Sequence, residues 1–396
     1  MLLGGLRYLL PVIKAAHHLG YYVITCDYLP DNIAHKYSDE YCNVSIVDKE
    51  AVLQAAKQLQ IDGILSFAVD PGVATAAYVA EKMGLPHSGS YESVSILQNK
   101  DLFRNFLTEH GFNVPKARGY HNYDTLLKEK DFFTWPVIVK PVDSAGSKGV
   151  TRVDRVDELE KAFNHALDNS ISKHVIVEEF IEKKGCSSDT DCFSVDGILR
   201  FVSFSAQRFD ESAANEYTPA AYSWPSTMTP QEEEFLTAEL QRLLSLLKMR
   251  TSIYNVETRI GTNGMPYIME VSPRGGGNRL AEMLRMATGV DLITNAVRAA
   301  VGDEVVGVEQ KPYNGHWAEV ILHASQDGVF QTVEIDSEIQ KNNLIELDLW
   351  KEKGDEISSF KGANDAIGTL VVRFDTADQL EEKMNRISDW VQVIVK

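Results

Sequence analysis

The chain has 396 residues, enough for three domains of ordinary size, and its 44% hydrophobic and 24% charged residues are typical of a globular protein. Its net charge of −18 argues against nonspecific nucleic-acid binding, which needs a basic surface. Because no apolar run approaches 18 residues and no signal peptide is recognisable, the sequence predicts a cytoplasmic protein with no nucleic-acid and no membrane partner.

Residues 1–95 alternate short apolar strands with helices, a pattern that predicts a parallel sheet covered by helices. Strands are expected at 2–3, 22–26, 44–47 and 64–67, and helices at 6–19, 49–59 and 71–83. The first strand is so short that we expect it at a sheet edge or as the remainder of a longer strand. An NAD-dependent oxidoreductase is an alternative that rests on these units and on Gly4-Gly5, a fragment of the GxGxxG motif.

A helix at 95–110, which carries Asn99-Lys100, is followed by a strand at 137–140 that ends in Lys140. The next residues, 142–150, are small and glycine-rich and lie between two β-runs. Backbone amides in such a loop can wrap a polyphosphate, and a lysine directly before it adds positive charge. A plain surface turn is the alternative. The candidate loop residues are Ser144, Gly146, Ser147 and Gly149.

Two later stretches suggest binding surfaces. The strand at 175–181 ends in Glu178-Glu179-Phe180-Ile181, where the backbone, a carboxylate and apolar side chains suit a purine pocket. A strand that simply leaves the core is the alternative. Residues 208–228 form a long connection with Tyr217, Tyr222 and Trp224, which we interpret as a cover over the substrate.

Residues 253–279 carry the strongest pattern of the chain. Two runs of alternating residues flank Asn263-Gly264, a strong hairpin signal, and a two-residue loop there places Glu257 opposite Glu270. Like charges side by side repel, so this pair needs a cation or a shared proton. Ligation by two carboxylates suits Mg²⁺. Two solvated glutamates on an exposed face are the alternative.

The segment after the second strand supports an anion site. Arg274, three glycines at 275–277 and Arg279 precede a helix. Arginines and open amides beside a metal indicate phosphate and carboxylate chemistry.

From residue 311 onward, short strands at 317–323, 329–333, 369–374 and 391–395 surround a helix at 377–390, which predicts a small α+β appendage. The four cysteines form no CxxC pair and are expected to be reduced thiols.

Taken in order, Asn99-Lys100, Lys140 with its loop, Glu178-Glu-Phe-Ile, Glu257 and Glu270-Val-Ser-Pro-Arg274 resemble the ATP-grasp superfamily of ligases over about residues 1–305. The pattern is most similar to the branch of L-amino acid ligases and carbamoyl phosphate synthases. The resemblance implies mixed α/β and α+β architecture: a leading βαβ domain (1–95), a small lobe (96–182) and a large lobe (183–310) that clasp ATP, and the appendage (311–396).

The resemblance also implies roles for individual residues. Lys100 and Lys140 contact the ATP phosphates, the 144–150 loop closes over them, and Glu178 to Ile181 hold adenine. Glu257 and Glu270 bind Mg²⁺, with Mn²⁺ as a substitute. Arg274 and Lys140 are the catalytic candidates. The expected substrate residues, led by Arg279 as an anchor for a carboxylate, are Arg279, Gly276, Gly277 and Trp224. An ion pair between Arg279 and a surface acid at a helix start is the alternative.

Two departures from the family pattern affect these roles. Ser272 stands where the family commonly has a metal-binding asparagine, and its hydroxyl is expected to ligate Mg²⁺ directly or through water. Cys192 stands where an acid usually binds the ribose, so Asp191 or Asp189 is expected to replace it.

The sequence therefore predicts an ATP- and Mg²⁺-dependent carboxylate–amine ligase. A carboxylic acid, expected to be an amino acid, forms an acyl phosphate and then joins an amine. The expected partners are small-molecule acid and amine substrates and, as one option, a second copy of the chain. A bicarbonate-using or carbamoyl-phosphate-type enzyme and a non-catalytic ATP-binding subunit are the alternatives.

Overall fold

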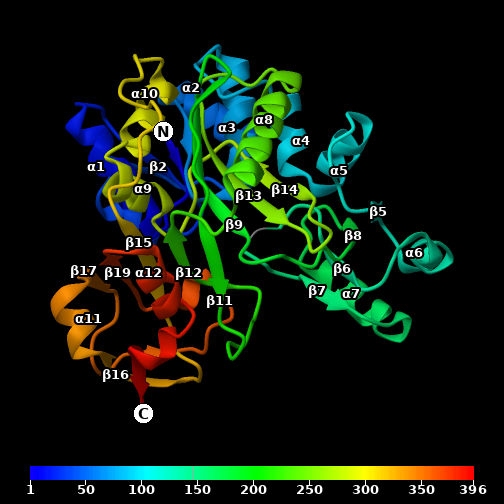
Figure 1. Ribbon diagram of the computed structural model, residues 1–396. Coiled ribbons are helices and arrows are strands. Elements are labelled where there is room, and N and C mark those ends of the chain that lie inside the picture. The colour runs from blue at the N-terminus through cyan, green and yellow to red at the C-terminus, as the bar shows by residue number, and fades with distance from the viewer. Residues whose placement is uncertain (145) are drawn as a thin grey trace.

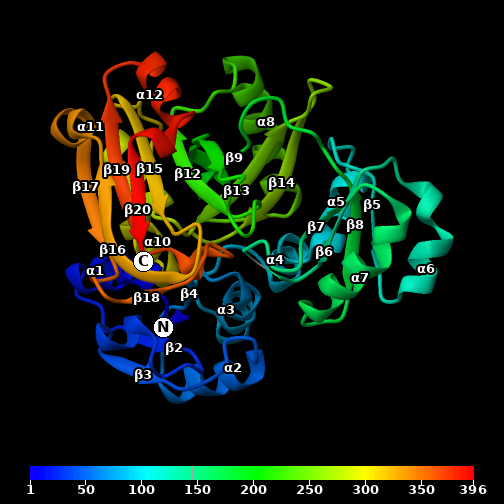
Figure 2. The same ribbon diagram turned by 90° about the horizontal axis from the view of Figure 1, so that it is seen from below.

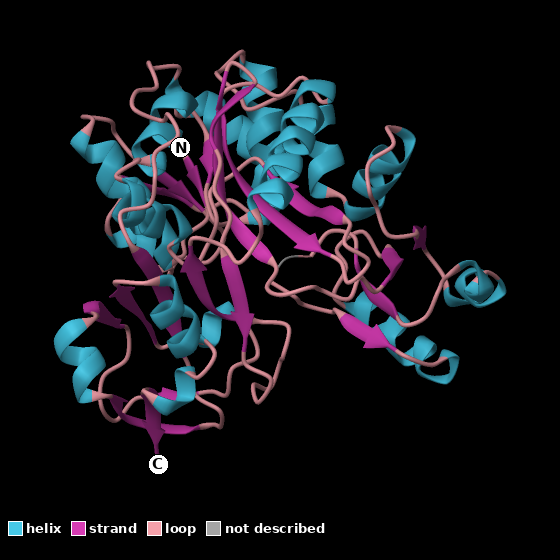
Figure 3. Cartoon of the chain, in the orientation of Figure 1, coloured by secondary structure: helices cyan, strands magenta, loops and turns pink. Residues whose placement is uncertain are grey.

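The computed structural model describes residues 1–144 and 146–396. Within this part of the chain, five sheets and their helices form a leading parallel unit, two antiparallel units and a C-terminal unit (Figures 1, 2 and 3). None of the helices in it has the length and apolar character that crossing a membrane requires. All four cysteines are free.

The leading unit is a parallel sheet of order β3-β2-β1-β4. Its elements are β1 Leu2–Leu3, α1 Leu10–His18, β2 Ile24–Cys26, β3 Glu40–Cys42, α2 Lys49–Gln58, β4 Leu65–Ser66 and α3 Asp70–Met83. The strand β1 lies inside the sheet, so the expectation of an edge strand is wrong. The strand expected at 44–47 is also wrong, because these residues form the turn in which Asp48 caps α2 through the Ala51 amide.

The helix expected at 95–110 is in fact two helices, α4 Tyr91–Gln98 and α5 Lys100–Glu109. Asn99 separates them, since its backbone is extended and its side chain accepts hydrogen bonds from the amides of Asp101 and Leu102. Asparagine is among the preferred N-cap residues. Lys100 therefore occupies the first turn of α5.

The small lobe is an antiparallel sheet of order β5-β8-β6-β7 with two helices on one side. Its elements are β5 Ala117–Tyr120, α6 Tyr123–Lys128, β6 Val137–Pro141, β7 Thr151–Val153, α7 Leu159–Asp168 and β8 Val175–Glu179. Alternating residues of β6, such as Val137 and Val139, pack against Phe163 of α7. The lobe thus has a core of its own and projects to the right in Figure 1.

The large lobe is an antiparallel sheet of order β10-β9-β13-β14. Its elements are β9 Ser188–Val195, β10 Ile198–Phe201, α8 Pro230–Leu246, β13 Ser252–Ile260, β14 Pro266–Ser272, α9 Leu280–Thr288 and α10 Leu292–Val301. A capping box between Thr229 and Glu232 begins α8, and the leucine stripe of α8 packs into one core with Val256 and Val271 of the hairpin.

The C-terminal unit contains a five-stranded sheet of order β11-β12-β15-β19-β17 and a three-stranded sheet of order β18-β16-β20. The strands are β11 Ala206–Phe209, β12 Pro219–Trp224, β15 His316–Leu322, β16 Gly328–Ile335, β17 Leu344–Leu349, β18 Glu356–Ile357, β19 Gly368–Phe374 and β20 Val391–Val395. The helices are α11 Ser337–Asn342 and α12 Ala377–Met384. Short 3-10 turns lie at Arg7–Leu9, Ile33–Lys36, Lys130–Phe132, Val156–Glu158, Ala363–Asp365 and Ile387–Asp389.

The segment 208–228, expected to be a long cover, instead contains most of a β-hairpin, β11–β12. Because β12 pairs with β15, this hairpin belongs to the C-terminal sheet. A division of the chain at residue 310 would therefore cut through one sheet.

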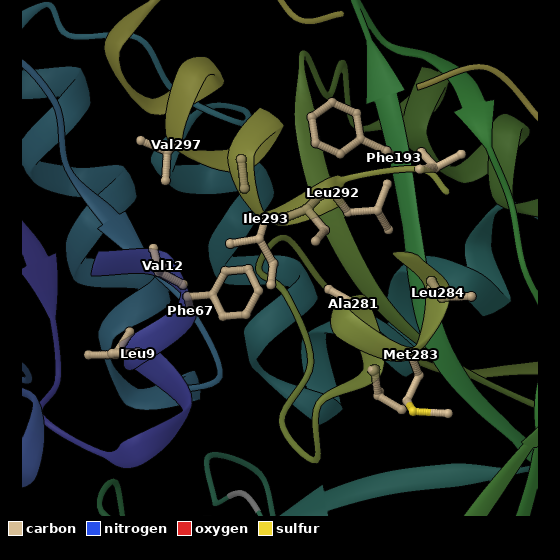
Figure 4. Packing of buried hydrophobic residues seen from close by; sticks show 14 of the residues in the cluster. Leu9, Val12, Phe67, Phe193, Ala281, Met283, Leu284, Leu292, Ile293 and Val297 are labelled. Carbon is tan, nitrogen blue, oxygen red and sulfur yellow. The ribbon is translucent and has the colours of Figure 1, made fainter. Parts of the chain in front are cut away.

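One hydrophobic cluster joins the leading unit, the large lobe and the C-terminal sheet. In Figure 4, Val12 of α1, Phe67 after β4 and Ile293 of α10 point toward one another. The ring of Phe67 also packs on Gly275, where a Cβ would lie 2.2 Å from two ring atoms. This contact fixes the glycine segment that follows β14 against the leading unit.

Candidate functional site

The hairpin β13–β14 places Glu257 opposite Glu270, as the sequence predicts. Both side chains are about one-third exposed, at 35% and 33%. Burial raises the pKa of Glu257, and repulsion from Glu270 adds to this against the attraction of Arg259. Two adjacent carboxylates with accessible oxygens fit a cation that prefers oxygen ligands.

The turn of this hairpin differs from the expected two-residue loop. The Gly261 amide donates to the Met265 carbonyl at 2.9 Å, so the loop consists of three residues, 262–264. Gly264 has φ 77°, a left-handed conformation that glycine adopts without strain. The pairs next to the loop, such as Ile260 with Pro266, are consequently one residue out of the expected register.

A bulge at Met269 corrects that offset, so that Glu257 and Glu270 come back into register. The freed carbonyl of Met269 accepts a hydrogen bond from Arg104 Nη1 at 2.9 Å. Arg104 Nε lies 3.0 Å from Glu178 Oε2 in the small lobe. Arg104 therefore ties the small lobe to the hairpin, at what we call the lobe junction: Lys100, Arg104, Lys140, Glu178, Glu257 and Glu270.

On the small-lobe side of the junction, Glu178 is fully paired. Lys140 of β6 donates to Glu178 Oε1 and Arg104 to Oε2. Although burial acts to raise it, the two cations lower the pKa of Glu178 to about 2. Burial is also the largest influence on Lys140 and leaves its pKa below the ordinary value, despite Glu178.

Lys100 connects the two sides of the junction. Its Nζ lies 3.4 Å from Glu270 Oε2 and donates to the Ser144 carbonyl at 3.1 Å. Burial lowers the pKa of Lys100, but Glu270 and Asp70 more than offset this and hold it above the ordinary value. Lys100 is thus positioned between the carboxylate pair and the start of the glycine-rich loop.

The predicted phosphate loop lies between β6 and β7. Gly146 and Gly149 have positive φ values of 66° and 73°. The hydroxyl of Ser147 donates to the Tyr217 carbonyl at 3.0 Å, in the connection between β11 and β12. Ala145 of this loop is outside the described residues.

The predicted adenine segment follows β8, and its side chains are partly engaged. The Glu179 carboxylate accepts the amides of Thr134 and Lys116 at 3.1 and 3.4 Å, so this side chain holds its own lobe together. The Phe180 ring packs under Arg152, with 4.5 Å from the guanidinium carbon to the ring centre. The Ile181 carbonyl accepts a hydrogen bond from Arg259 of β13. Adenine binding through the Glu179 carboxylate therefore does not match the structure.

Ser272 and Arg274 are both bound to Asp70, at the start of α3 in the leading unit. Arg274 makes a bidentate pair with the Asp70 carboxylate at 2.9 and 2.7 Å. The Ser272 hydroxyl donates to Asp70 at 3.1 Å and accepts from Gln98 at 2.8 Å. Ser272 is buried and its hydroxyl already has two partners, which corrects its expected role as a metal ligand. Burial acts to lower the pKa of Arg274, but Asp70 and Glu270 hold it above the ordinary value.

The glycine segment 275–277 is held by Asp191. The Gly276 amide donates to Asp191 Oδ1 at 2.8 Å, so this amide is not available to a substrate as expected. Asp191 itself is completely buried, which corrects its expected role at the ribose. Gly277, in contrast, is partly exposed, and a Cβ there would meet only the Tyr8 ring at 3.9 Å.

Asp189 lies on β9 directly beside Glu257. It accepts hydrogen bonds from Asn255 at 2.7 Å and from the Tyr222 hydroxyl at 3.1 Å. The three carboxylates of Asp189, Glu257 and Glu270 therefore form one row across neighbouring strands. In the part of the chain that the structure describes, no group of three or more His, Cys, Asp or Glu side chains is arranged to hold a metal ion. A metal at the Glu257–Glu270 pair would take its other ligands from water or phosphate.

Two predicted substrate residues are placed elsewhere. Trp224 is fully buried in the core, so it cannot cover a substrate. The Arg279 guanidinium pairs with Glu346 at 2.7 Å and Glu282 at 3.5 Å and donates to Thr369. The alternative for Arg279, an ion pair with acids near a helix start, therefore matches the structure better than a substrate anchor does.

Sequence reasoning missed Arg104 and Asp70. Arg104 lies four residues after Lys100 on α5 and so on the same helix face, a spacing that could have identified it. Asp70 follows β4 at the start of a helix, where polar residues of parallel units commonly serve a site. No pattern in the sequence indicates that Asp70 pairs with Arg274, since 204 residues separate them.

Comparisons with known proteins relate part of the chain to a domain family. Residues 133–282 match the family model described as an ATP-grasp domain. The chain is 24% identical over 238 residues to the carbamoyl phosphate synthase large chain of Thermoanaerobacter sp. (strain X514), covering 58% of this chain. It is 29% identical over 184 residues to the formate-dependent phosphoribosylglycinamide formyltransferase of Synechococcus sp. (strain WH7803), covering 46% of this chain.

The chain covers only 21% of the first of these curated relatives and 47% of the second. Among solved structures, the L-amino acid ligase from Bacillus licheniformis superimposes with a TM-score of 0.83 over 100% of this chain and 98% of that one, at 18% identity. A likeness at this identity shows a shared fold.

Proposed function

We propose that this protein, whose residues 133–282 form an ATP-grasp domain, is an ATP- and Mg²⁺-dependent ligase that joins a carboxylic acid to an amine. The observation that carries the proposal is the Glu257–Glu270 pair, held in register opposite Lys100 and Lys140. This arrangement combines the oxygen ligands of a Mg²⁺ site with cations suited to phosphate. An amino acid is the proposed acid.

Glu257 and Glu270 would hold the metal, whose chemistry is to neutralise charge on the β- and γ-phosphates. Lys100 and Lys140 bind the phosphates. Arg274, fixed by Asp70, stabilises the transferring group beside the hairpin. Arg104 keeps the small lobe aligned with the hairpin, because its two contacts lie on opposite sides of the junction.

In the first step, a carboxylate oxygen of the acid attacks the γ-phosphorus, the bond to the β-phosphate oxygen breaks, and ADP leaves. In the second step, a neutral amine attacks the carbonyl carbon of the acyl phosphate. The C–O bond to phosphate breaks, inorganic phosphate leaves, and the amine nitrogen loses a proton. Both steps depend on positioning and on excluding water from the acyl phosphate.

The test is ADP release measured against a panel of amino acids, offered singly and in pairs, with mass spectrometry of the products. We expect ADP and inorganic phosphate in equal amounts with an amide, and only when an acid and an amine are both present. ADP release without any amide under all pairings would contradict the ligase proposal.

Bicarbonate is a second candidate for the acid, favoured by the similarity to carbamoyl phosphate synthase. A small anion such as bicarbonate needs no aromatic cover, and Trp224, an expected cover residue, is buried in the core. ATP cleavage that requires bicarbonate and yields no amide would support this alternative.

A further inference from the structure

The five-stranded C-terminal sheet carries a buried acid for which the proposed reaction has no use. Glu319 on β15 is completely buried, and neither of its carboxylate oxygens has a hydrogen-bond partner among the described residues. A buried charged or polar group without a partner is costly, so such a residue calls for an explanation. Its position in the fold suggests one.

Glu319 belongs to an acidic cluster around Arg279; a second arginine, Arg285, also acts on the pKa of Glu282 but pairs with Asp291 outside the cluster. Arg279 pairs with Glu282 of α9 and Glu346 of β17. Burial raises the pKa of Glu319 most, Arg279 opposes this, and the two glutamates add to the rise. Glu346 lies in the same row of the sheet, since both glutamates are opposite Val371 on its two neighbouring strands. When ionised, the cluster has three negative charges and one positive charge. The ionised cluster therefore has a net negative charge.

A chain of neighbouring polar side chains joins this cluster to the β13–β14 hairpin, which carries Glu257 and Glu270. Glu319 lies directly across from Tyr222 of β12. The Tyr222 hydroxyl donates to Asp189, which stands beside Glu257. Each cross-strand step spans about 5 Å. A substrate that reacts at the hairpin could thus reach the cluster with a side chain of several bonds.

Tyr8 of the leading unit has contacts with both the cluster and a nearby pocket. Its hydroxyl donates to Asn278, whose amide in turn donates to Tyr222. Burial raises the pKa of this hydroxyl, Glu319 adds to the rise and Arg279 opposes it. Tyr8 also lines a pocket of about 200 Å³ together with Arg7 and Trp350, and none of the three acids of the cluster is among its lining residues. Tyr8 is thus the residue that links this pocket to the cluster.

We propose that Glu319, with Glu282 and Glu346, forms a subsite that binds the positively charged end of a substrate, an ammonium or guanidinium group. This inference rests on the proposed ligase function and names the substrate class, an amino acid with a cationic side chain. The incoming cation would supply the missing charge and give the Glu319 oxygens their partners.

The test compares matched substrates that differ only by the charged group: L-lysine with L-norleucine, and L-arginine with L-citrulline. The kcat/KM for ADP release is measured for each, in the presence of MgATP and a partner amino acid. We expect the wild type to prefer the cationic member at least about tenfold. In Glu319→Gln this ratio should fall to about one.

Two variants separate a binding role from a structural one. Arg279→Met removes the competing cation and should raise the cationic-to-neutral ratio, which a structural defect would not do. Glu334→Gln removes an exposed acid of the same appendage and should leave the ratio unchanged. A ratio near one in the wild type, or an unchanged ratio in a folded Glu319→Gln, would overturn the proposal.

If no acid and amine pair supports ADP release, the proposed function fails, and binding alone decides the inference. Calorimetry of L-lysine and L-norleucine with MgADP present should then show tighter binding of L-lysine. It should also show proton release, because burial holds the pKa of Glu319 well above its ordinary value and a bound cation lets it ionise. Equal binding of the two, or none, would refute the subsite.

Discussion

The two sides of the lobe junction differ in how closely their acids are paired with cations. On the small-lobe side, Glu178 is buried and paired with both Lys140 and Arg104. On the hairpin side, Glu257 lies between Asp189 and Glu270 on neighbouring strands. The cations near the hairpin acids are more distant, with Lys100 3.4 Å from Glu270 and Arg259 3.9 Å from Glu257.

This difference indicates two kinds of role. A buried acid with two cations is already satisfied, so Glu178 fixes the position of Lys140 and Arg104. Glu257 and Glu270 are partly exposed and the cations paired with them lie 3.9 and 3.4 Å away, so a divalent cation would relieve the repulsion between them. Under the proposed function, the first side would orient the phosphate-binding groups, and the second side would provide the metal ligands.

The largest expected effect is on the hairpin side. Glu270→Gln replaces one ligand carboxylate with a neutral amide, and we expect Mg²⁺-dependent ATP turnover to fall at least about a thousandfold, or about 4 kcal/mol in the barrier. Turnover is measured by ADP release and folding by circular dichroism. Near-normal turnover in a folded variant would refute the metal role of the pair.

On the small-lobe side, Lys140→Ala should affect stability and nucleotide binding together. It leaves Glu178 buried with only Arg104, which should cost about 2–4 kcal/mol in the free energy of unfolding. The KM for ATP should rise about tenfold or more, because a phosphate contact is lost.

A double variant separates these two effects. Lys140→Ala with Glu178→Gln removes the unpaired charge and should regain part of the stability, but not the affinity for ATP. Recovery of ATP affinity in the double variant would mean that Lys140 serves the fold alone.

The pairing of Glu178 also predicts how stability depends on pH. Its folded pKa of about 2 lies below the ordinary value of 4.5, so the pair contributes stability above pH 4.5 that is lost as the pH falls toward 2. Urea unfolding should show a loss on the order of 2–3 kcal/mol across this window. Glu178→Gln should reduce the slope. An identical slope in the variant would contradict the assigned pairing.

The smallest effect is expected at the hairpin turn. Gly264→Ala forces alanine into a φ of 77° and should cost about 1 kcal/mol of stability. The KM for ATP should hardly change, because the bulge at Met269 lies between the turn and the carboxylate pair. A large rise in KM would mean that the turn itself sets the register of the glutamates.

The sequence predicted the hairpin pair because strand period and turn chemistry are local properties. The register was right for a different reason, since a longer loop and a bulge offset each other. The phosphate roles of the loop residues and the lysines were likewise predicted from local patterns, and they stay predictions. The parallel order of the first sheet followed from the alternation of strands and helices, although β1 was misplaced within it.

Long-range pairing could not be predicted. Arg274 binds Asp70 and Arg279 binds Glu346, and neither partner is marked by any nearby motif. Trp224 was expected in a substrate cover because it lies in a long connection with other aromatic residues, yet pairing of β12 with β15 buries it. Burial of Asp191 and Ser272 also depends on strands and helices that are distant in the chain.

The central claim is that Glu257 and Glu270 bind a divalent cation together with the nucleotide. Mn²⁺ binding in the presence of ADP, followed by electron paramagnetic resonance, tests it most directly, with Glu334→Gln as the control for a lost surface charge. The account predicts that the wild type and the control bind Mn²⁺ alike, and that Glu257→Gln with Glu270→Gln weakens binding more than about tenfold. Equal Mn²⁺ affinity in the folded double variant would contradict the account.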